Sequence, residues 1–275
     1  RPMPRRNFVD HAVWITGGGS GIGAALALEF ARNGAMVAVS GRRRDRLEQV
    51  VAAIEACGSR GLAVVCDVTD DPAVEQAVAE VQAAFGKIDV VVANAGFAVS
   101  GRIEDLAIEA WRRQFDTNVF GAVSTIRHAL PALKASGGRL GLMCSVAGMI
   151  ASPKSGPYTA SKYALRAIGQ TLAIELAGSG VSCTLLHPGF VSSEIAQVDN
   201  SGVRDASRPD RRPSKLMWPA DAAAKVCAKA LHRRDREYTF TGHGKFGAFV
   251  GRHLPGLAHT LMTRSAGWSS KRKSS

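Results

Sequence analysis

The 275-residue sequence lacks the features that would place it across a membrane or in an oxidising compartment. No stretch of 18 or more uninterrupted apolar residues occurs, so a membrane-spanning helix is not expected. The cysteines are odd in number and form no C-x-x-C pair; they are Cys57, Cys66, Cys144, Cys183 and Cys227. Free thiols in predicted strands are usually small buried hydrophobes. Because no signal-like apolar segment starts the chain, we expect a cytoplasmic protein with reduced thiols.

Two further absences argue against a metal site and against binding of nucleic acid. No cluster of His, Cys and carboxylate residues has metal-ligand spacing, so no metal is expected. No nucleic-acid-binding motif occurs, and aromatic residues do not alternate with basic ones. Nucleic acid is therefore not an expected partner, although the net charge is +12.

The positive charge is concentrated near the C-terminus. Residues 204–275 contain 16 Lys and Arg against 5 Asp and Glu, whereas residues 1–203 contain 19 against 18. In this basic region, apolar residues between 246 and 262 lie among Lys245, Arg252, Arg264 and the tail 271–273. This mixture suits a segment that lies in a membrane interface, so the protein could be membrane-associated. The alternative is that the segment packs on the protein core or on a second subunit and ends in a disordered basic tail.

Apolar runs typical of strands alternate with helical patterns along the chain. The expected strands are Ala12–Ile15, Val37–Ser40, Leu62–Cys66, Val90–Ala93, Arg139–Cys144 and Val181–His187. The helical patterns include Asp71–Phe85, Leu106–Ser136 and Ser161–Leu176. This alternation predicts an α/β fold: a Rossmann-like, doubly wound parallel sheet flanked by helices. No repeat or Pro-rich linker divides the chain, so we expect one catalytic domain over residues 1–240 and a basic, partly apolar extension over 241–275.

A glycine-rich turn follows the first expected strand and precedes a helical pattern. It runs from Thr16 to Gly23, with the sequence TGGGSGIG. Glycines let a backbone turn tightly and approach a pyrophosphate, which binds the free N–H groups of the following helix. The turn therefore predicts a dinucleotide site.

Tyr158 and Lys162 are the most informative pair of residues in the sequence. Four positions apart in a helical stretch, they share one face of the helix. An ammonium beside a phenol favours the phenolate, so we expect Lys162 to lower the pKa of Tyr158. A tyrosine tuned in this way can exchange a proton with a substrate oxygen near neutral pH.

The chain resembles the short-chain dehydrogenase/reductase family, in its single-domain form with T-G-x-x-x-G-x-G and Y-x-x-x-K motifs. Between and after these two motifs, further matches occur in the family's order: Asp67-Val68, Asn94-Ala95-Gly96, Asn118, Ser145 and Pro188-Gly189. The resemblance runs from about residue 9 to about residue 195. Asn94-Ala95-Gly96 is similar to the family's N-N-A-G stretch, with Ala93 in place of the first Asn. The family also builds a substrate lid after its cofactor loop, which here implies a lid over about residues 190–218.

The resemblance implies a role for each matched residue. The implied catalytic residues are Asn118, Ser145, Tyr158 and Lys162. The implied cofactor contacts are Gly17, Ser20, Gly21, Ile22, Gly23, Ser40, Arg42, Asp67, Val68, Asn94, Ala95, Gly96, Tyr158, Lys162, Pro188, Gly189, Val191 and Ser193. The implied substrate contacts are Ser145, Val146, Tyr158 and Phe190, with Met149, Ile150 and Met217 as further apolar candidates.

In this scheme Ser145 and Tyr158 hydrogen-bond the carbonyl oxygen of the substrate, and Tyr158 donates the proton. Lys162 holds the nicotinamide ribose, and Asn118 keeps a water in a proton relay to Lys162. Ser193 takes the position where a Thr often meets the carboxamide.

The end of the second strand indicates which cofactor binds. An acidic residue there would bind the ribose 2′-OH of NAD, whereas an Arg accommodates the 2′-phosphate of NADP. Here Ser40 and Gly41 are followed by Arg42, Arg43 and Arg44, and the first acid is Asp45. We expect NADP(H), with Arg42 as the main contact and Ser40 adding a hydroxyl. The alternative is that the arginines only begin a solvated helix.

These features predict an NADP(H)-dependent oxidoreductase that reversibly reduces a ketone to an alcohol. The apolar candidates indicate that the substrate is a hydrophobic small molecule, such as a lipid or steroid-like ketone. The resemblance also implies a homo-oligomer, a dimer or tetramer, because relatives in the family form such assemblies. The alternatives are a NAD-linked alcohol dehydrogenase and a non-catalytic NADP-binding sensor or membrane-surface scaffold.

Overall fold

A computed structural model gives the architecture of residues 7–271, apart from 201, 202, 204, 206, 209 and 211, and without the side chains of 196 and 265–271. Parts of the sequence-based interpretation lie outside the described residues: the lid positions 201, 202, 204, 206, 209 and 211, Arg272 and Lys273 of the tail, and residues 1–6, 274 and 275 of the expected domains.

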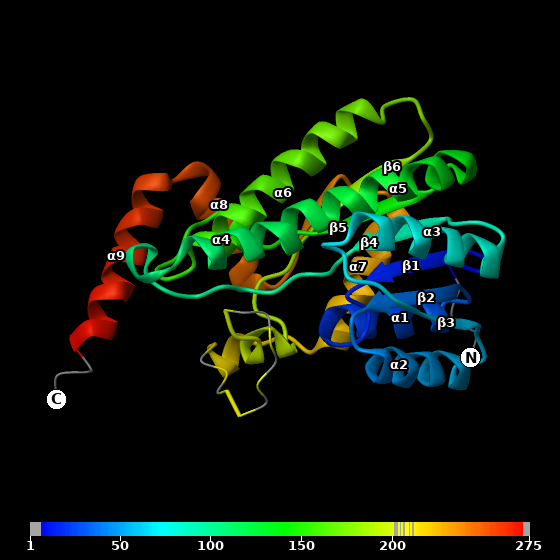
Figure 1. The fold of residues 1–275 in the computed structure, drawn as a ribbon. Helices are drawn as coiled ribbons and strands as arrows, with labels where there is room; N and C mark the ends of the chain where they lie inside the picture. Colours follow the sequence, from blue (N-terminus) through cyan, green and yellow to red (C-terminus); the bar gives the residue numbers. More distant parts are fainter. Residues whose placement is uncertain are drawn as a thin grey trace, which may run out of the picture.

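The described part of the chain forms one parallel sheet with the strand order β3-β2-β1-β4-β5-β6-β7 (Figure 1). The strands are β1 (Ala12–Thr16), β2 (Met36–Gly41), β3 (Gly61–Val65), β4 (Val90–Ala93), β5 (Arg139–Met143), β6 (Ser182–His187) and β7 (Glu237–Thr239). The order reverses between β1 and β4, which pair with each other. In open parallel sheets, ligands bind at such a reversal, beyond the carboxyl ends of the strands.

Helices cover both faces of the sheet (Figure 1). One face carries α1 (Gly21–Arg32), α2 (Arg44–Ala56) and α7 (Ala220–Arg233); the other carries α3 (Asp71–Phe85), α5 (Gly121–Ser136) and α6 (Gly156–Glu175). Strands buried on both faces are apolar throughout, as the burial of every residue of β1 and β4 illustrates. The predicted doubly wound fold is therefore confirmed. Cys66, Cys144, Cys183 and Cys227 are buried free thiols, and Cys57 is exposed.

The expected strands agree with the structure to within one residue at each end, and three larger differences occur. The predicted helix Leu106–Ser136 is wrong as one element: α4 (Ile108–Phe115) and α5 are separated by a π-helical turn, Asp116–Phe120. That turn carries Asn118, whose buried amide bonds the neighbouring loop. The helix predicted from Ser161 begins earlier, at Gly156. Strand β7 was not predicted, because it is only three residues long and only partly buried.

The chain ends in two helices at one end of the molecule, α8 (Gly242–His253) and α9 (Pro255–Lys271) (Figure 1). Helix α8 packs on the short 3-10 turn η3 (Val146–Gly148) that follows β5. Small residues permit this approach, since a Cβ at Gly251 would lie 2.3 Å from the carbonyl oxygen of Met149. Helix α9 extends away from the sheet.

Candidate active site

A cavity of about 700 Å³ lies where the sheet order reverses. Most of its lining comes from the loops that follow strands β1 to β6, at one edge of the sheet. Helices α4 and α6 add Arg113, Tyr158 and Lys162. The predicted cofactor contacts in the lining are Gly17, Ser20, Gly21, Ile22, Gly23, Arg42, Asp67, Val68, Asn94, Ala95, Gly96, Tyr158, Lys162, Pro188 and Ser193. Among the described lining residues, the predicted contacts Ser40, Gly189 and Val191 are missing.

The glycine turn has the geometry that the sequence predicts. Gly17 and Gly21 have positive φ angles of 64° and 54°, a region that favours glycine. A Cβ at Gly23 would lie 2.4 Å from the carbonyl oxygen of Gly17, so only glycine fits there. The turn is fixed from the side by Asn94, whose Nδ2 donates to the carbonyl oxygens of Thr16 and Gly17 at 2.9 and 3.1 Å.

This turn fits a dinucleotide pyrophosphate. The N-cap residue of α1, Ser20, makes no side-chain hydrogen bond to the first turn of the helix. The N–H groups of that turn therefore remain for another acceptor, and the positive end of the helix dipole favours an anion. The glycines leave the backbone bare on the cavity side, where a side chain would block a close approach.

The cationic rim of the cavity comes from the segment after β2. Arg42, Arg43 and Arg46 all line it. The expected contribution of Ser40 is wrong: this residue is fully buried, and its Oγ accepts a hydrogen bond from Trp14 Nε1 at 3.0 Å. The cause is the pairing of β1 with β2, which places Trp14 beside Ser40 in the sheet core.

Tyr158 and Lys162 lie in α6 and reach the same cavity. Lys162 Nζ lies 5.7 Å from the centroid of the Tyr158 ring and donates to the carbonyl oxygen of Met143 at 2.7 Å. The Lys162 side chain is buried, and this burial lowers its pKa to about 8. The sequence prediction of their proximity is correct.

The expected lowering of the Tyr158 pKa is wrong. Burial raises the pKa of Tyr158 above its ordinary value, because the phenolate loses its hydration. The hydrogen bond with Ser145 and the charge of Arg212 act in the opposite direction but are smaller. Lys162, whose ammonium donates to the Met143 carbonyl, does not offset this increase in the pKa of Tyr158.

Asn118 anchors the loop that follows β4. Its Oδ1 accepts from the Phe97 N–H, and its Nδ2 donates to the Phe97 carbonyl oxygen and to Ser161 Oγ, all at 3.1 Å. The residue is buried beside the cavity and does not line it. Asn118 thus joins the loop after β4 to Ser161, the residue that precedes Lys162 in α6. Its role in a proton relay stays a prediction.

Ser145 follows β5 and is held in place from its backbone. The ring Nδ1 of the buried His187 lies 3.1 Å from the Ser145 carbonyl oxygen. The other ring nitrogen lies 2.9 Å from Glu237 Oε1. The contact with His187, with Arg166 and Arg252 adding to it, holds the pKa of Glu237 well below its usual range. His187 therefore connects β6 to the Ser145 backbone and to Glu237 of β7.

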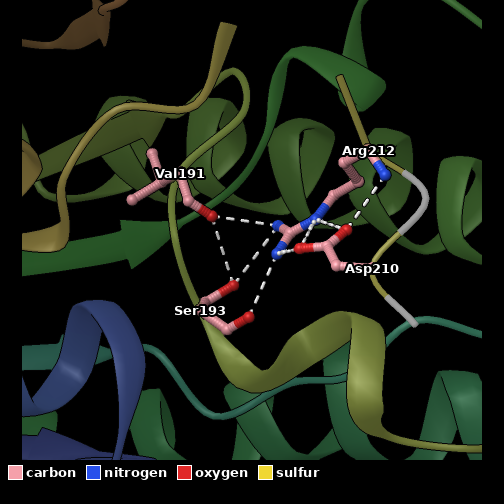
Figure 2. Close-up of polar contacts among 4 residues, drawn as sticks. All are labelled: Val191, Ser193, Asp210 and Arg212. Carbon is pink, nitrogen blue, oxygen red and sulfur yellow. Dashed lines mark hydrogen bonds and ion pairs between the residues drawn. The ribbon is translucent and has the colours of Figure 1, made fainter. Parts of the chain in front are cut away.

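The loop after β6 is fastened by a residue that the sequence analysis missed. Arg212 donates to the carbonyl oxygens of Val191 and Ser193 at 2.9 and 3.0 Å, and Asp210 holds its guanidinium through both carboxylate oxygens (Figure 2). Val191 is buried and turns its carbonyl to Arg212, which explains its absence from the cavity lining. No motif marks Arg212, since it lies 19 residues from Ser193 in a polar segment.

The start of α8 forms a wall beside the same loop. A Cβ at Gly189 would lie 2.4 Å from Thr241 Oγ1, and the Phe190 N–H donates to His243 Nε2 at 3.0 Å. The rings of Phe190 and His243 are stacked, 5.2 Å apart. Part of the C-terminal extension therefore packs on the active-site loop, while the expected substrate contacts Val146 and Phe190 lie under or beside it and not in the described lining of the cavity.

Comparison with known proteins agrees with this site. A sequence model described as short chain dehydrogenase matches residues 11–204. The chain belongs to the short-chain dehydrogenase/reductase family. A 3beta-hydroxysteroid dehydrogenase of Mediterraneibacter gnavus is 33% identical over 198 residues, 72% of each chain. The protein is thus an oxidoreductase of this family.

Two solved structures of short-chain dehydrogenases have closely similar folds. One from Burkholderia cenocepacia in complex with NADP has a TM-score of 0.74 and 30% identity, over 84% of this chain and 96% of that one. One from Burkholderia phymatum in complex with NAD has a TM-score of 0.75 and 26% identity, over 84% and 89%. Membership of the family therefore leaves the choice between the two cofactors to the residues at the cavity rim.

Proposed function

We propose that this short-chain dehydrogenase/reductase uses NADP(H) to reduce a ketone on a hydrophobic small molecule, reversibly. The observation that carries the proposal is that Tyr158 and Lys162 line a cavity with an arginine rim beside the glycine turn. Ser145, which is not among the described lining residues, hydrogen-bonds Tyr158 next to this cavity. A bound nicotinamide dinucleotide supplies the hydride. The remaining chemistry falls to the residues of this chain.

Tyr158 is the proton donor. Its raised pKa keeps it a phenol at neutral pH, which is the form that reduction requires. Ser145 shares the carbonyl oxygen with Tyr158 and stabilises the charge that develops there. Lys162, which here donates to the Met143 carbonyl, would hold a ribose hydroxyl of the bound cofactor and would add positive charge near the reacting oxygen.

The rim supports NADP(H) over NAD(H). Arg42, Arg43 and Arg46 line the cavity after β2, and the arginine fork suits a phosphate. No carboxylate follows the strand end until Asp45, in the first turn of α2. A NAD-linked dehydrogenase with the same catalytic residues is the second candidate.

An apolar environment supports a hydrophobic substrate. Val146, Ile150 and Phe190 lie together with α8 beyond Ser145. The Mediterraneibacter relative is named a hydroxysteroid dehydrogenase, which supports a steroid-like ketone or a lipid of similar bulk.

A spectrophotometric screen tests the proposal. Purified protein is incubated with NADPH or NADH and a series of ketones, from steroids to 3-keto acyl chains, and loss of absorbance of the reduced cofactor is followed. Turnover of apolar ketones with NADPH is the expected result. Cofactor binding without turnover of any ketone would favour a sensor or scaffold, and turnover with NADH alone would favour the NAD-linked alternative.

The C-terminal helices support a further proposal, a peripheral contact with anionic membranes. Phe246 and Phe249 on α8, Leu254 between the two helices, and Leu257 and Leu261 on α9 are all exposed. No helix among the described residues is both long and apolar enough to cross a bilayer. The same face could instead pair two copies, and a homo-oligomer is the assembly we propose on family grounds.

A further inference from the structure

The lid carries a carboxylate that pairs with two arginines of the cofactor rim. Glu194 begins the 3-10 helix η4 (Glu194–Gln197), directly after Ser193. Its Oε2 lies 3.0 Å from Arg43 Nη2, and its Oε1 lies 3.7 Å from Arg46 Nη2. Arg43 and Arg46 come from the segment after β2, about 150 residues away in sequence. The pair therefore joins the lid to the opposite side of the cavity.

The contact lies across the glycine turn. Arg43 Nη2 also reaches Ser20 Oγ at 3.4 Å. A Cβ at Gly19 would lie 3.3 Å from Arg46 Cβ, and a Cβ at Gly21 would lie 3.1 Å from Ser193 Cβ. The lid, the turn and the arginines thus touch one another, and Glu194, Arg43, Arg46 and Ser20 all line the same cavity.

The ion pairs are exposed enough to exchange partners. The side chains of Arg43, Arg46 and Glu194 are 42%, 35% and 22% exposed. Ion pairs in such surroundings are weak, because water and salt screen them. A phosphate monoester carries more charge than a carboxylate at neutral pH and offers three acceptor oxygens, so it competes well for an arginine fork.

We propose that Glu194 is a specificity-determining residue, whose carboxylate holds Arg43 and Arg46 and so opposes a 2′-phosphate on the adenosine ribose of the cofactor. NAD(H), which lacks that phosphate, leaves the ion pairs of Glu194 in place. The 2′-phosphate of NADP(H) must compete with Glu194 for the two arginines, and the negative charges of the phosphate and the carboxylate repel each other. The inference rests on the proposed function only in taking a nicotinamide dinucleotide as the ligand of the cavity.

The test is a comparison of affinities in one variant. Glu194→Gln keeps the shape and removes the charge. The ratio of the NADH to the NADPH dissociation constants, measured by fluorescence titration, is expected to increase about two- to fivefold, the factor that one exposed ion pair contributes. Glu194→Asp, which keeps the charge, should change the ratio less than Glu194→Gln does.

Two controls separate this effect from a general change of charge. Glu48→Gln removes a carboxylate that pairs with Arg44 at 3.7 Å on the exposed side of α2, and it should leave the ratio at its wild-type value. In a chain that already carries Arg43→Ala and Arg46→Ala, Glu194→Gln should change the ratio less than it does in the wild type, because only the repulsion between Glu194 and the phosphate is left to remove. An unchanged ratio in Glu194→Gln, or an equal change in Glu48→Gln, would overturn the inference.

The binding of fragments distinguishes this inference from the proposed cofactor preference. Adenosine 2′,5′-bisphosphate and AMP differ in the 2′-phosphate and lack the nicotinamide. The preference of the wild-type protein between them tests the choice of NADP(H). The change of that preference in Glu194→Gln tests Glu194, whichever of the two the wild-type protein prefers.

Discussion

Lys162 Nζ lies 5.7 Å from the centre of the Tyr158 ring while it donates a 2.7 Å hydrogen bond to the carbonyl oxygen of Met143. Met143 ends β5, so the ammonium connects the catalytic helix α6 to the sheet. The hydrogen bond to β5 therefore holds the lysine near the Tyr158 ring without any bond to the phenol. Because of this, a substitution that removes only the phenol oxygen tests the role of Tyr158 while Lys162 stays in place.

Replacing Tyr158 by Phe removes the proton donor and keeps the ring. Ketone reduction should fall by roughly 10²–10⁴-fold, the usual contribution of a positioned acid. Cofactor affinity should hardly change, because the ring and Lys162 stay in place. Initial rates and fluorescence titration with NADPH measure the two effects. Turnover within tenfold of wild type would contradict the assignment of Tyr158.

The buried Lys162 should make the free energy of unfolding depend on pH in the alkaline range. Its pKa is lowered to about 8 in the folded protein from 10.5, so between these values the unfolded chain holds a proton that the folded one has released. Stability from this group therefore rises with pH in that window. From pH 7.0 to pH 9.5 the wild type should gain about 2 kcal/mol relative to Lys162→Met.

Urea unfolding of both proteins at the two pH values measures this gain. Because other groups titrate in both proteins, only the difference between them reports on Lys162. Lys134→Met, at an exposed position of α5, is the matched control and should show no such difference. A gap between Lys162→Met and wild type that stays constant with pH would mean that the lysine titrates in its ordinary range.

Arg212 should control cofactor binding through the loop after β6. Arg212→Ala removes its bonds to the carbonyl oxygens of Val191 and Ser193, so the cofactor Kd should rise roughly tenfold, the effect of one bond to a charged group. Arg212→Lys should not restore binding, because an ammonium cannot make the forked set. Since Arg212 lowers the pKa of Tyr158, the alanine variant should also need a higher pH for alcohol oxidation.

The control for this loop is Lys215→Ala, an exposed residue of η5 (Ser214–Leu216). It should leave the Kd and the pH profile unchanged. An Arg212→Ala protein with a normal cofactor Kd and a normal pH profile would show that Arg212 does not control cofactor binding or the pKa of Tyr158.

Residues whose roles depend on local spacing were predictable from the sequence. The glycine turn between a strand and a helix, and the four-residue separation of Tyr158 and Lys162, are each encoded within a few positions. The strand alternation likewise indicated the doubly wound sheet, because buried parallel strands are apolar throughout.

Residues brought in from distant segments were not predictable. Arg212, Thr241 and His243 reach the loop after β6 only through the tertiary fold. The burial of Ser40 depends on Trp14 in the neighbouring strand, which no local pattern reports. The raised pKa of Tyr158 depends on its burial, which helical spacing does not determine.

Arg42 should contribute to NADPH affinity in a cofactor-specific way. Arg42→Ala is expected to weaken NADPH binding by about 1.5–3 kcal/mol, the range for a hydrogen bond to a charged group, and to change NADH binding little. Arg44→Ala is the matched control, because Arg44 is 69% exposed and pairs with Glu48. Equal affinity of the wild type for NADPH and NADH would count against NADP(H) as the cofactor.

The exposed apolar face of α8 and α9 should bind anionic membranes. Helix α8 has two faces: Gly244, Gly247 and Gly251 pack toward Val146 and Ile150, whereas Phe246 and Phe249 point away and are 64% and 56% exposed. Exposed basic residues on these helices, Lys245 and Arg264, would attract an anionic bilayer by about 1 kcal/mol each near its surface. Purified protein should therefore co-sediment with phosphatidylserine-containing vesicles and much less with neutral ones.

Salt and substitutions separate the two contributions to this binding. Binding should weaken as salt rises, because the attraction fades within a Debye length, and the aromatic side chains should leave a salt-resistant remainder. Replacing Phe246 and Phe249 by Ser should remove that remainder without loss of reductase activity, since both side chains are exposed. Lys245→Gln with Arg264→Gln should remove mainly the salt-dependent part. If the face instead pairs two copies of the chain, no vesicle binding should occur at low salt, and the Phe246 and Phe249 replacements should lower the mass measured by light scattering.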